Sequence, residues 1–268
     1  MLEATAPKVG NVHRGADFDD LTFTDFMASA VAIAPAMELA AQAGVGQTIH
    51  TAITATRSLV DTNTNLGIVL LLAPLAAVPQ GESLGLGVAK VLRSLTPDDS
   101  RLVYAAIRLA MPGGLGKVDE MDVGDVAPPD LLVAMRAAAD RDLVARQYAQ
   151  DFQLVLEQVG PWILAGTRQS WSLTDAIIHT HLRLLAEYPD SLILRKRGPK
   201  MARQVSTLAA SILAIGGPPS EEYYAALSDF DFFLRSDDHQ RNPGTTADLI
   251  AAGLFALLRD GALQPPLW

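Results

Sequence analysis

Thirteen almost wholly apolar residues, Leu66 to Val78, follow directly on five polar residues, Asp61 to Asn65. A helix that crosses a membrane needs roughly 20 apolar residues in a row, so this run is too short to span a bilayer. We therefore expect it to form a helix buried in a hydrophobic core. The polar residues in front of it either cap that helix or form a polar site at its N-terminal end.

The rest of the sequence has the pattern of an all-helical protein. Apolar residues recur at helical spacing, and the alternating Val, Ile and Thr runs typical of strands are nearly absent. Glycine and proline interrupt this pattern at intervals that leave room for roughly ten helices. With 268 residues, 49% of them hydrophobic, the chain can bury a large core. We expect an all-α fold, a single multi-helix domain of packed helices over residues 1–268.

Charge and composition argue against several classes of protein. The chain has 30 acidic residues against 21 Lys and Arg, a net charge of −9, whereas sequence-independent binding of nucleic acid needs a basic surface. It has no cysteine, which excludes disulfides and thiolate chemistry. The first residues contain no apolar targeting segment. We expect a cytoplasmic protein that binds neither nucleic acid nor a membrane.

The segment KVGNVHRGADFDD, residues 8–20, gathers a base, an amide, an imidazole and three carboxylates. Mg²⁺ prefers carboxylate oxygens and water, so Asp17, Asp19 and Asp20 are candidate metal ligands. Asp17, Asp20 and His13 are candidate catalytic groups. The alternative is that Asp19 or Asp20 caps a helix starting near residue 21 and that the remainder is a solvated loop.

The polar residues before the apolar run are candidate substrate-binding residues. If Asn63 or Thr64 caps the helix, Asn65 lies in its first turn and can face outward, where its amide both donates and accepts hydrogen bonds. The unpaired N–H groups of a helix N-terminus also attract phosphate. The alternative is that these side chains serve only to start the helix.

The longest irregular stretch, residues 111–130, contains Gly113, Gly114, Gly116 and Lys117 close together. It lacks the glycine and the Ser/Thr of a phosphate loop at Met111 and Val118, so it remains a weak anion-binding signal. A dense basic cluster comprises Arg195, Lys196, Arg197, Lys200 and Arg203. This cluster indicates either polyphosphate binding or a solvated helix end, where basic residues are favoured by the helix dipole.

A last polar segment, residues 237–255, contains the turn Asn242-Pro243-Gly244. Thr245 and Asp248 follow at the spacing of a capping box, which predicts a helix start there. Asn242 and Thr245 remain candidates for substrate contact beside that structural role.

Five motifs run in order along nearly the whole chain: KVGNVH, NTNLG leading into IVLLLAPLAA, GGLGKVDEMDV, DSLILRKRG and NPGTTADL. Together they resemble the triphosphoribosyl-dephospho-coenzyme A synthase family, and most closely a divergent branch of it. Two motifs differ from the family pattern. The usual Lys-Pro-Gly-Asn is here Lys-Val-Gly-Asn at residues 8–11, and the Asn-Thr-His-Lys-Gly of characterised enzymes is Asn-Thr-Asn-Leu-Gly at 63–67.

The resemblance implies an all-helical transferase of pentosyl groups that uses ATP with Mg²⁺. The family joins the ribose of ATP to the 2′-hydroxyl of dephospho-coenzyme A and releases adenine. Such a displacement needs a base near the hydroxyl, a hydrogen bond to the leaving base and clamps for the phosphates. The resemblance assigns nucleotide contact to Asn63, Thr64 and Asn65. It makes phosphate clamps of Lys8, Lys117, Arg195 and Lys196, and it leaves Asn11 as a further contact.

Two other functions stay open at this point. The same fold could act on another phosphorylated or nucleotide substrate in the synthesis of a coenzyme, such as a one-carbon carrier of pterin or furan type. The chain could instead be a non-catalytic helical binding protein, which would show no affinity for a metal ion at residues 17–20. A homodimer is compatible with each of these functions.

Overall fold

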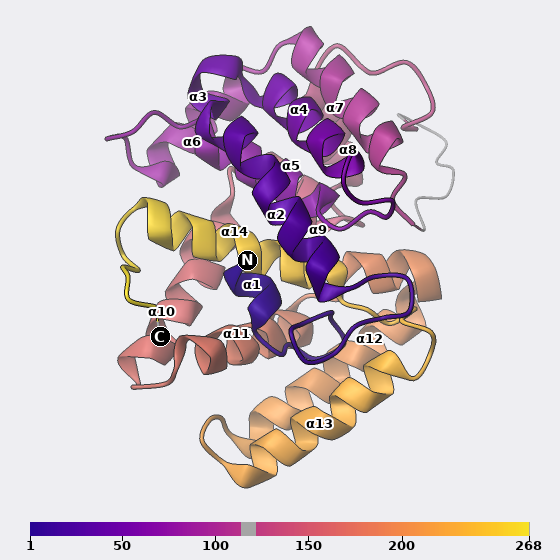
Figure 1. Ribbon diagram of the computed structural model, residues 1–268, viewed down its shortest axis with the longest axis vertical. Coiled ribbons are helices and arrows are strands. Elements are labelled where there is room, and N and C mark those ends of the chain that lie inside the picture. The colour runs from indigo at the N-terminus through magenta and orange to yellow at the C-terminus, as the bar shows by residue number, and fades with distance from the viewer. Residues whose placement is uncertain (114–121, 268) are drawn as a thin grey trace. The chain divides into compact units, whose positions relative to one another are not determined.

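The computed structural model describes residues 1–113 and 122–267 (Figure 1). Within them the chain forms fourteen α-helices and one π-helix, Leu154–Val159, and no β-strand. The predicted all-α fold is therefore confirmed. The expected number of roughly ten helices is close to this count, and short helices such as α1 (Leu2–Thr5) and α3 (Ala40–Ala43), which have four residues each, account for part of the difference.

Contacts between Cα atoms divide the chain into two compact units. Unit 1 consists of Met1–Phe23 and Glu157–Trp268, and unit 2 of Thr24–Leu156. Besides α1, unit 1 holds α10 (Gly160–Arg168), α11 (Leu173–Glu187), α12 (Ser191–Ile215), α13 (Glu221–Arg235) and α14 (Gly244–Arg259). Besides α3, unit 2 holds α2 (Phe23–Glu38), α4 (Val45–Arg57), α5 (Leu66–Ala76), α6 (Leu84–Arg93), α7 (Pro97–Ala110), α8 (Leu131–Ala138) and α9 (Leu143–Ala149). A single domain over residues 1–268 stays a prediction.

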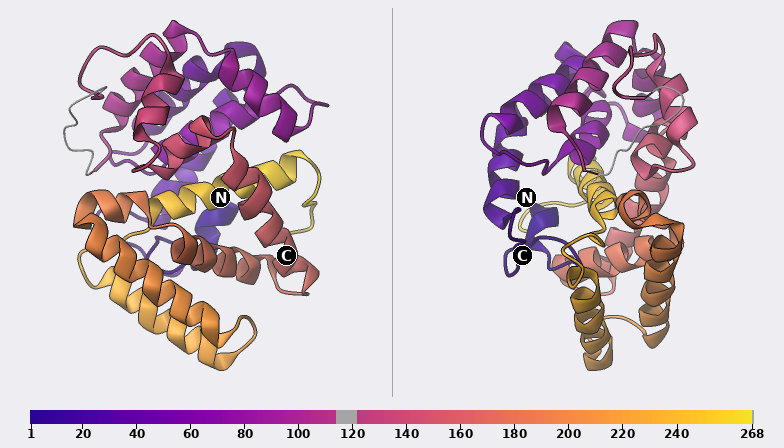
Figure 2. Two further views of the ribbon diagram at one scale, coloured as in Figure 1. Left: turned by 180° about the vertical axis from the view of Figure 1, so that it is seen from behind. Right: turned by 90° about the vertical axis from the view of Figure 1, so that its right-hand side faces the viewer.

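The core of unit 1 lies among α11, α12 and α13. Buried residues recur every three or four positions along each helix, as in Leu182 and Leu185 of α11 or Leu227, Phe230 and Leu234 of α13. Helices α12 and α13 contact each other and run side by side in Figures 1 and 2. A kink at Gly198, where φ is 78°, separates the basic first turns of α12 from the rest of the helix.

The centre of unit 2 is α5, which the apolar run predicted as a buried helix. It contacts α3, α4, α6 and α9, and Val69, Leu71 and Leu75 are wholly buried. The expectation of a core helix is confirmed. In the described part of the chain, no helix combines the length and the apolar character that a membrane span requires.

A tyrosine from α9 replaces a hydrogen bond that a proline removes from α5. Pro74 has no N–H, so the carbonyl of Leu70, four residues earlier, loses its helical donor. The hydroxyl of Tyr148 donates to that carbonyl at 2.6 Å, although the two residues are 78 positions apart in the sequence. Tyr148 is 2% exposed. The pairing therefore satisfies a buried backbone group that the helix itself cannot satisfy.

We expect Tyr148→Phe to lower the free energy of unfolding by about 1–3 kcal/mol, because the carbonyl of Leu70 is left without a donor. In a Pro74→Ala background the helix regains an N–H for this carbonyl. Tyr148→Phe should then lower the free energy of unfolding by a smaller amount. Urea unfolding of the wild type, both single variants and the double variant measures the coupling. An equal cost of Tyr148→Phe in both backgrounds would contradict the pairing.

One histidine lies in the interior of unit 1. His181 on α11 is wholly buried, and neither ring nitrogen has a hydrogen-bond partner. Burial, reinforced by the positive charge of Lys8, lowers the pKa of His181 from 6.5 to about 3. His181 therefore has the surroundings of a residue that packs in the interior of unit 1.

This histidine should make the protein acid-sensitive. Because the folded-state pKa lies below the unfolded one, the neutral ring stabilises the fold above pH 6.5, and this contribution is lost as the pH falls towards 3. We expect the wild type to lose stability relative to a His181→Leu variant by up to about 1.4 kcal/mol per pH unit across this window. Denaturant midpoints measured at several pH values test it, and parallel curves for the two proteins would refute it.

Candidate functional site

Two of the predicted polar segments meet in unit 1. The Nδ2 of Asn11 donates to the Oδ1 of Asn242 at 2.6 Å, across 231 residues of sequence. The Oδ1 of Asn11 is buried and has no partner. The sequence named both residues as substrate contacts, and the structure brings them together.

The segment that carries Asn11 is fixed against α13. The N–H of Gly10 donates to Asp231 at 2.7 Å, and Arg235 pairs with Asp231 at 2.8 Å while also donating to the carbonyl of Asn11. Gly10 has a φ of +73°, and a Cβ there would come within 2.8 Å of the ring of Pro243. Only glycine fits at this position, which explains why the two motifs can approach so closely.

Asp190 joins the starts of α12 and α14. Its Oδ1 accepts from the N–H groups of Leu192 and Ile193 at 2.8 and 3.0 Å. Its Oδ2 accepts from both the N–H and the hydroxyl of Thr246, at 2.7 and 2.8 Å. Asp190 is 1% exposed, and this burial raises the pKa of its carboxyl group against the effect of these hydrogen bonds.

The predicted capping box at Thr245 and Asp248 is wrong. Helix α14 begins at Gly244, and no side chain of its own N-cap residue, Pro243, can accept a hydrogen bond. Thr245 lies inside the first turn and is buried. The N–H of Thr246 in the first turn donates instead to Asp190, which local spacing cannot reveal. The sequence also contains no indication of the role of Thr246. The one related signal was Asp190, an aspartate shortly before an apolar run, which marks a helix start.

The basic cluster is divided by the kink in α12. Arg195 and Lys196 precede the kink and are partly buried, whereas Lys200 and Arg203 follow it and are exposed. Arg197 pairs with Asp237 at 3.1 Å. Burial lowers the pKa of Lys196, while the charges of Asp20 and Asp190 act in the opposite direction. Lys196 therefore lies within electrostatic reach of two carboxylates.

Lys8, a predicted phosphate clamp, lies in the interior of unit 1. Its side chain is 0% exposed, and its Nζ lies 2.7 Å from the carboxylate of Glu3. The ammonium group also donates to the backbone carbonyl of Glu3 at 2.6 Å. These contacts hold α1 against the following loop. The ammonium group of Lys8 is therefore paired inside the protein and is not exposed at the surface.

The three aspartates of residues 17–20 have separate surroundings. The Oδ1 of Asp17 accepts from the N–H of Phe23 at 2.6 Å and so serves the start of α2. Asp20 has a side chain that is 65% exposed and lies 3.6 Å from the Nε2 of His239, while Asp19 is exposed. No group of three or more acidic or histidine side chains that could hold a metal ion occurs in residues 1–113 and 122–267.

His13 has a defined tautomer. Its Nδ1 accepts from the N–H of Gly15 at 3.1 Å, which places the proton of the neutral ring on Nε2. Burial lowers the pKa of His13, and the positive charge of Arg235 adds to this effect. His13 is therefore neutral at pH 7 and offers an N–H donor.

The polar segment before α5 belongs to unit 2. The Oδ1 of Asn63 accepts from the N–H of Leu66 at 3.1 Å, as expected of a residue that starts the helix. Thr64 shares a 2.6 Å hydrogen bond with Ser29 of α2, and the Nδ2 of Asn65 donates to Thr56 of α4 at 3.0 Å. The sequence missed Ser29 and Thr56, because both lie on other helices.

The expectation that Asn65 faces outward is wrong. Asn65 is 5% exposed and is the N-cap residue of α5, with a φ of −150°, rather than a residue of the first turn. Its amide packs against α4 instead of pointing to solvent. Lys117 and its flanking glycines 114 and 116 lie outside the described residues.

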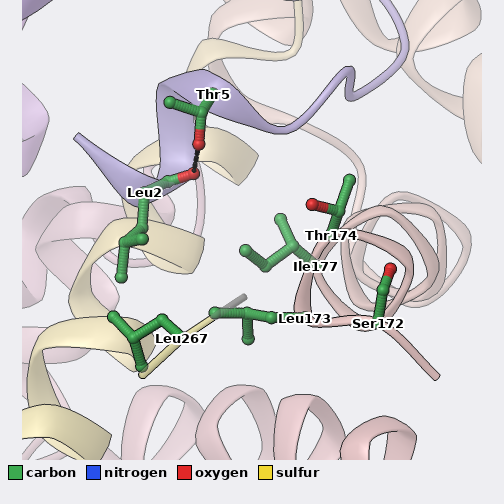
Figure 3. A pocket seen from close by; sticks show the side chains of 7 residues that line it. All are labelled: Leu2, Thr5, Ser172, Leu173, Thr174, Ile177 and Leu267. Atoms are coloured by element: carbon green, nitrogen blue, oxygen red, sulfur yellow. Dashed lines mark hydrogen bonds between the residues drawn. The ribbon is translucent and has the colours of Figure 1, made fainter. Parts of the chain in front are cut away.

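A pocket of about 210 Å³ lies elsewhere in unit 1, between α1, the start of α11 and Leu267. Its aliphatic lining consists of Leu2, Leu173, Ile177 and Leu267, and Figure 3 shows these side chains together with a hydrogen bond from Thr5 to the carbonyl of Leu2. Its lining includes Ser172 and Thr174 but no charged side chain and none of the predicted site residues. It therefore offers no counter-charge to a phosphorylated substrate.

Comparison with protein-family models identifies a family for this chain. The family model described as ATP:dephospho-CoA triphosphoribosyl transferase, CitG, matches residues 1–265. The fold is similar to that of a candidate triphosphoribosyl-dephospho-coA synthase from Archaeoglobus fulgidus, with 24% identity and a TM-score of 0.66 over 88% of this chain and 99% of that chain. A search of the curated proteins finds no match. The predicted resemblance is confirmed, and the chain belongs to the CitG family of ATP:dephospho-CoA triphosphoribosyl transferases.

Proposed function

We propose that this chain transfers the triphosphoribosyl group of ATP to the 2′-hydroxyl of dephospho-coenzyme A. The C1′–N9 bond of ATP breaks, a bond forms between C1′ and the hydroxyl oxygen, and the hydroxyl proton is balanced by protonation of the departing adenine. The observation that supports this is the assembly of three predicted segments within unit 1. Asn11 meets Asn242, and Asp190 joins the basic start of α12 to the start of α14.

The phosphate groups are proposed to bind at the first turns of α12. Arg195 and Lys196 are partly buried there, and a cation that is partly withdrawn from water interacts more strongly with an anion than an exposed one does. The neighbouring polar groups of Asn242 and Thr245 supply hydrogen bonds. Arg197 is already paired with Asp237.

The proposed base is Asp20. Its carboxylate is largely exposed and is not used to start a helix, whereas Asp17 already accepts the N–H of Phe23. A general base must have an oxygen available to the proton that it removes. His13, neutral with its proton on Nε2, is suited to donate a hydrogen bond to the substrate rather than to remove a proton.

Mg²⁺ is proposed to enter with ATP rather than to reside in the protein. The described residues hold no preformed group of three acidic or histidine ligands. These residues fit a Mg²⁺ ion whose ligands are mostly water molecules and substrate phosphates. The protein would add only one or two carboxylate ligands. Asp19, which is exposed, could supply such an oxygen. The bound ion would offset negative charge on the triphosphate.

A second candidate function uses the same chemistry with another hydroxyl acceptor. The observation that favours it is the motif at residues 63–67, where Asn65 and Leu66 stand in place of the His and Lys of characterised enzymes. Leu66 is 7% exposed and belongs to the core of unit 2. We further propose that the protein acts in the cytoplasm and that a homodimer is its assembled form.

We expect incubation with ATP, Mg²⁺ and dephospho-coenzyme A to release adenine and to yield the triphosphoribosyl conjugate, because the family reaction leaves both products. Mass spectrometry detects each product, and a reaction without the acceptor is the control. Adenine release that requires a different phosphorylated acceptor would favour the second candidate. If ATP at 100 times its Kd raised stability by about 2.7 kcal/mol without any product, the protein would be a binder and not a transferase.

Asp17 and Asp20 form a matched pair for testing the site. Asp20→Asn should reduce kcat at least tenfold and leave the melting temperature unchanged, because the exposed carboxylate contributes to chemistry and little to packing. Asp17→Ala should lower stability by about 1 kcal/mol, because it removes the oxygen that accepts a backbone N–H at the start of α2. Steady-state kinetics and thermal melts on both variants check this. Stability loss in Asp20→Asn with normal kcat would remove it from the site.

A further inference from the structure

His239 is a polar residue of unit 1 that the proposed function does not use. It lies in the turn between α13 and α14, where Asp238 and His239 both have a left-handed backbone, with φ of 50° and 45°. Residues other than glycine seldom adopt this conformation, and two in succession persist only where the surrounding contacts hold them. Such residues gather at functional sites, which makes the contacts of this histidine informative.

Two contacts hold this histidine, one through its backbone and one through its ring. The carbonyl of His239 accepts from the N–H of Asn242 at 3.1 Å, which ties the turn to the residue that pairs with Asn11. The imidazole packs on the ring of Phe18, with 4.7 Å between the ring centroids, and the guanidinium of Arg235 lies 5.2 Å from the centroid of the same phenyl ring. The side chain of His239 is 21% exposed. The imidazole therefore has little freedom to reorient.

The imidazole faces the proposed base. The Nε2 of His239 lies 3.6 Å from the Oδ1 of Asp20. Asp20 belongs to a tight turn in which Phe18 and Leu21 exchange backbone hydrogen bonds of 2.9 and 3.4 Å. This turn fixes the backbone of Asp20, but an exposed side chain still changes rotamer rapidly in water. His239 is placed to select one orientation of this exposed carboxylate.

The length of this contact indicates what it does. A separation of 3.6 Å is too long for a hydrogen bond, and an exposed ion pair adds little to stability. Catalytic hydrogen bonds are often long in enzymes without substrate and shorten when the substrate binds. The Nε2 is a donor in the protonated ring and in the neutral Nε2–H tautomer alike. A small rotation of the Asp20 carboxylate brings Oδ1 onto this donor and leaves Oδ2 for a substrate proton.

We infer that His239 is a positioning residue for Asp20 in the transfer reaction. Its Nε2–H holds Oδ1, while Oδ2 takes the proton of the acceptor hydroxyl as the bond from C1′ to the hydroxyl oxygen forms and the C1′–N9 bond breaks. Oδ2 then releases this proton to water, and the departing adenine takes a proton from water, so His239 gives up none. This inference rests on the proposed function, since it adds a partner to the proposed base.

Two substitutions separate this role from packing on Phe18. His239→Phe keeps an aromatic ring and removes the N–H, whereas His239→Gln keeps an N–H donor of similar reach and removes the ring. We expect His239→Phe to keep the melting temperature and both KM values and to lower kcat by about tenfold, because only the transition state loses an interaction. His239→Gln should recover part of this loss. The assay measures adenine release from ATP with Mg²⁺ and dephospho-coenzyme A.

A double variant tests whether His239 acts through Asp20. In an Asp20→Asn background, His239→Phe should lower kcat no further, because the carboxylate that it positions is already gone. The matched control is Tyr224→Phe, which removes a donor to another carboxylate of unit 1, that of Asp175 on α11 at 2.8 Å. This control should keep the wild-type kcat.

The possible outcomes keep this inference apart from the proposed function. A wild-type kcat in His239→Phe, or losses that multiply in the double variant, would overturn the inference and leave the proposed function standing. A lower melting temperature in His239→Phe without recovery of kcat in His239→Gln would assign His239 to packing and would overturn it as well. Absence of adenine release by the wild type would overturn the proposed function and this inference with it.

Discussion

Unit 1 depends on one buried carboxylate. Asp190 accepts four hydrogen bonds, two from the first turn of α12 and two from Thr246 of α14. An isolated carboxylate in a protein interior would be costly, but donors in this number satisfy it, and two helix N-termini both favour a negative charge at their ends. Burial raises the pKa of Asp190, while the N–H groups of Ile193 and Thr246 and the charge of Arg195 lower it. The N–H groups that Asp190 links therefore also stabilise the charged form of its carboxyl group.

The geometry of the candidate site follows from this connection. Asp190 is hydrogen-bonded to the first turns of both α12 and α14. It therefore keeps the basic residues near the start of α12 close to the polar turn that precedes α14. Asn242 in that turn then accepts from Asn11, and the loop carrying Asn11 is held against α13 by Asp231 and Arg235. Segments from widely separated parts of the chain are therefore fixed in one polar region without a disulfide.

The sequence predicts well whatever a local pattern determines. The apolar run identified α5 and its burial, and the motifs identified the family. The motifs also named Asn11 and Asn242 as candidates for substrate contact, and the structure brings these two residues together. It fails where a partner comes from a distant position. Nothing near Pro74 indicates that Tyr148 will serve the carbonyl of Leu70, and nothing near Thr246 indicates Asp190. Asn65 was misplaced for the same reason, since its side chain hydrogen-bonds Thr56 on another helix.

Lys196 shows how an acidic protein can prepare a site for a polyanion. Most of the nearby cations are paired with carboxylates, as Arg197 and Arg241 are with Asp237 and Arg235 is with Asp231. Lys196 is partly buried, which lowers its pKa, and the charges of Asp20 and Asp190 oppose that effect. These carboxylates favour the ammonium form before any substrate is present. A phosphate that approaches adds further negative charge near a cation already partly withdrawn from water, where the attraction is least screened. A net charge of −9 therefore does not argue against a phosphorylated substrate, because a cation held in this way acts locally.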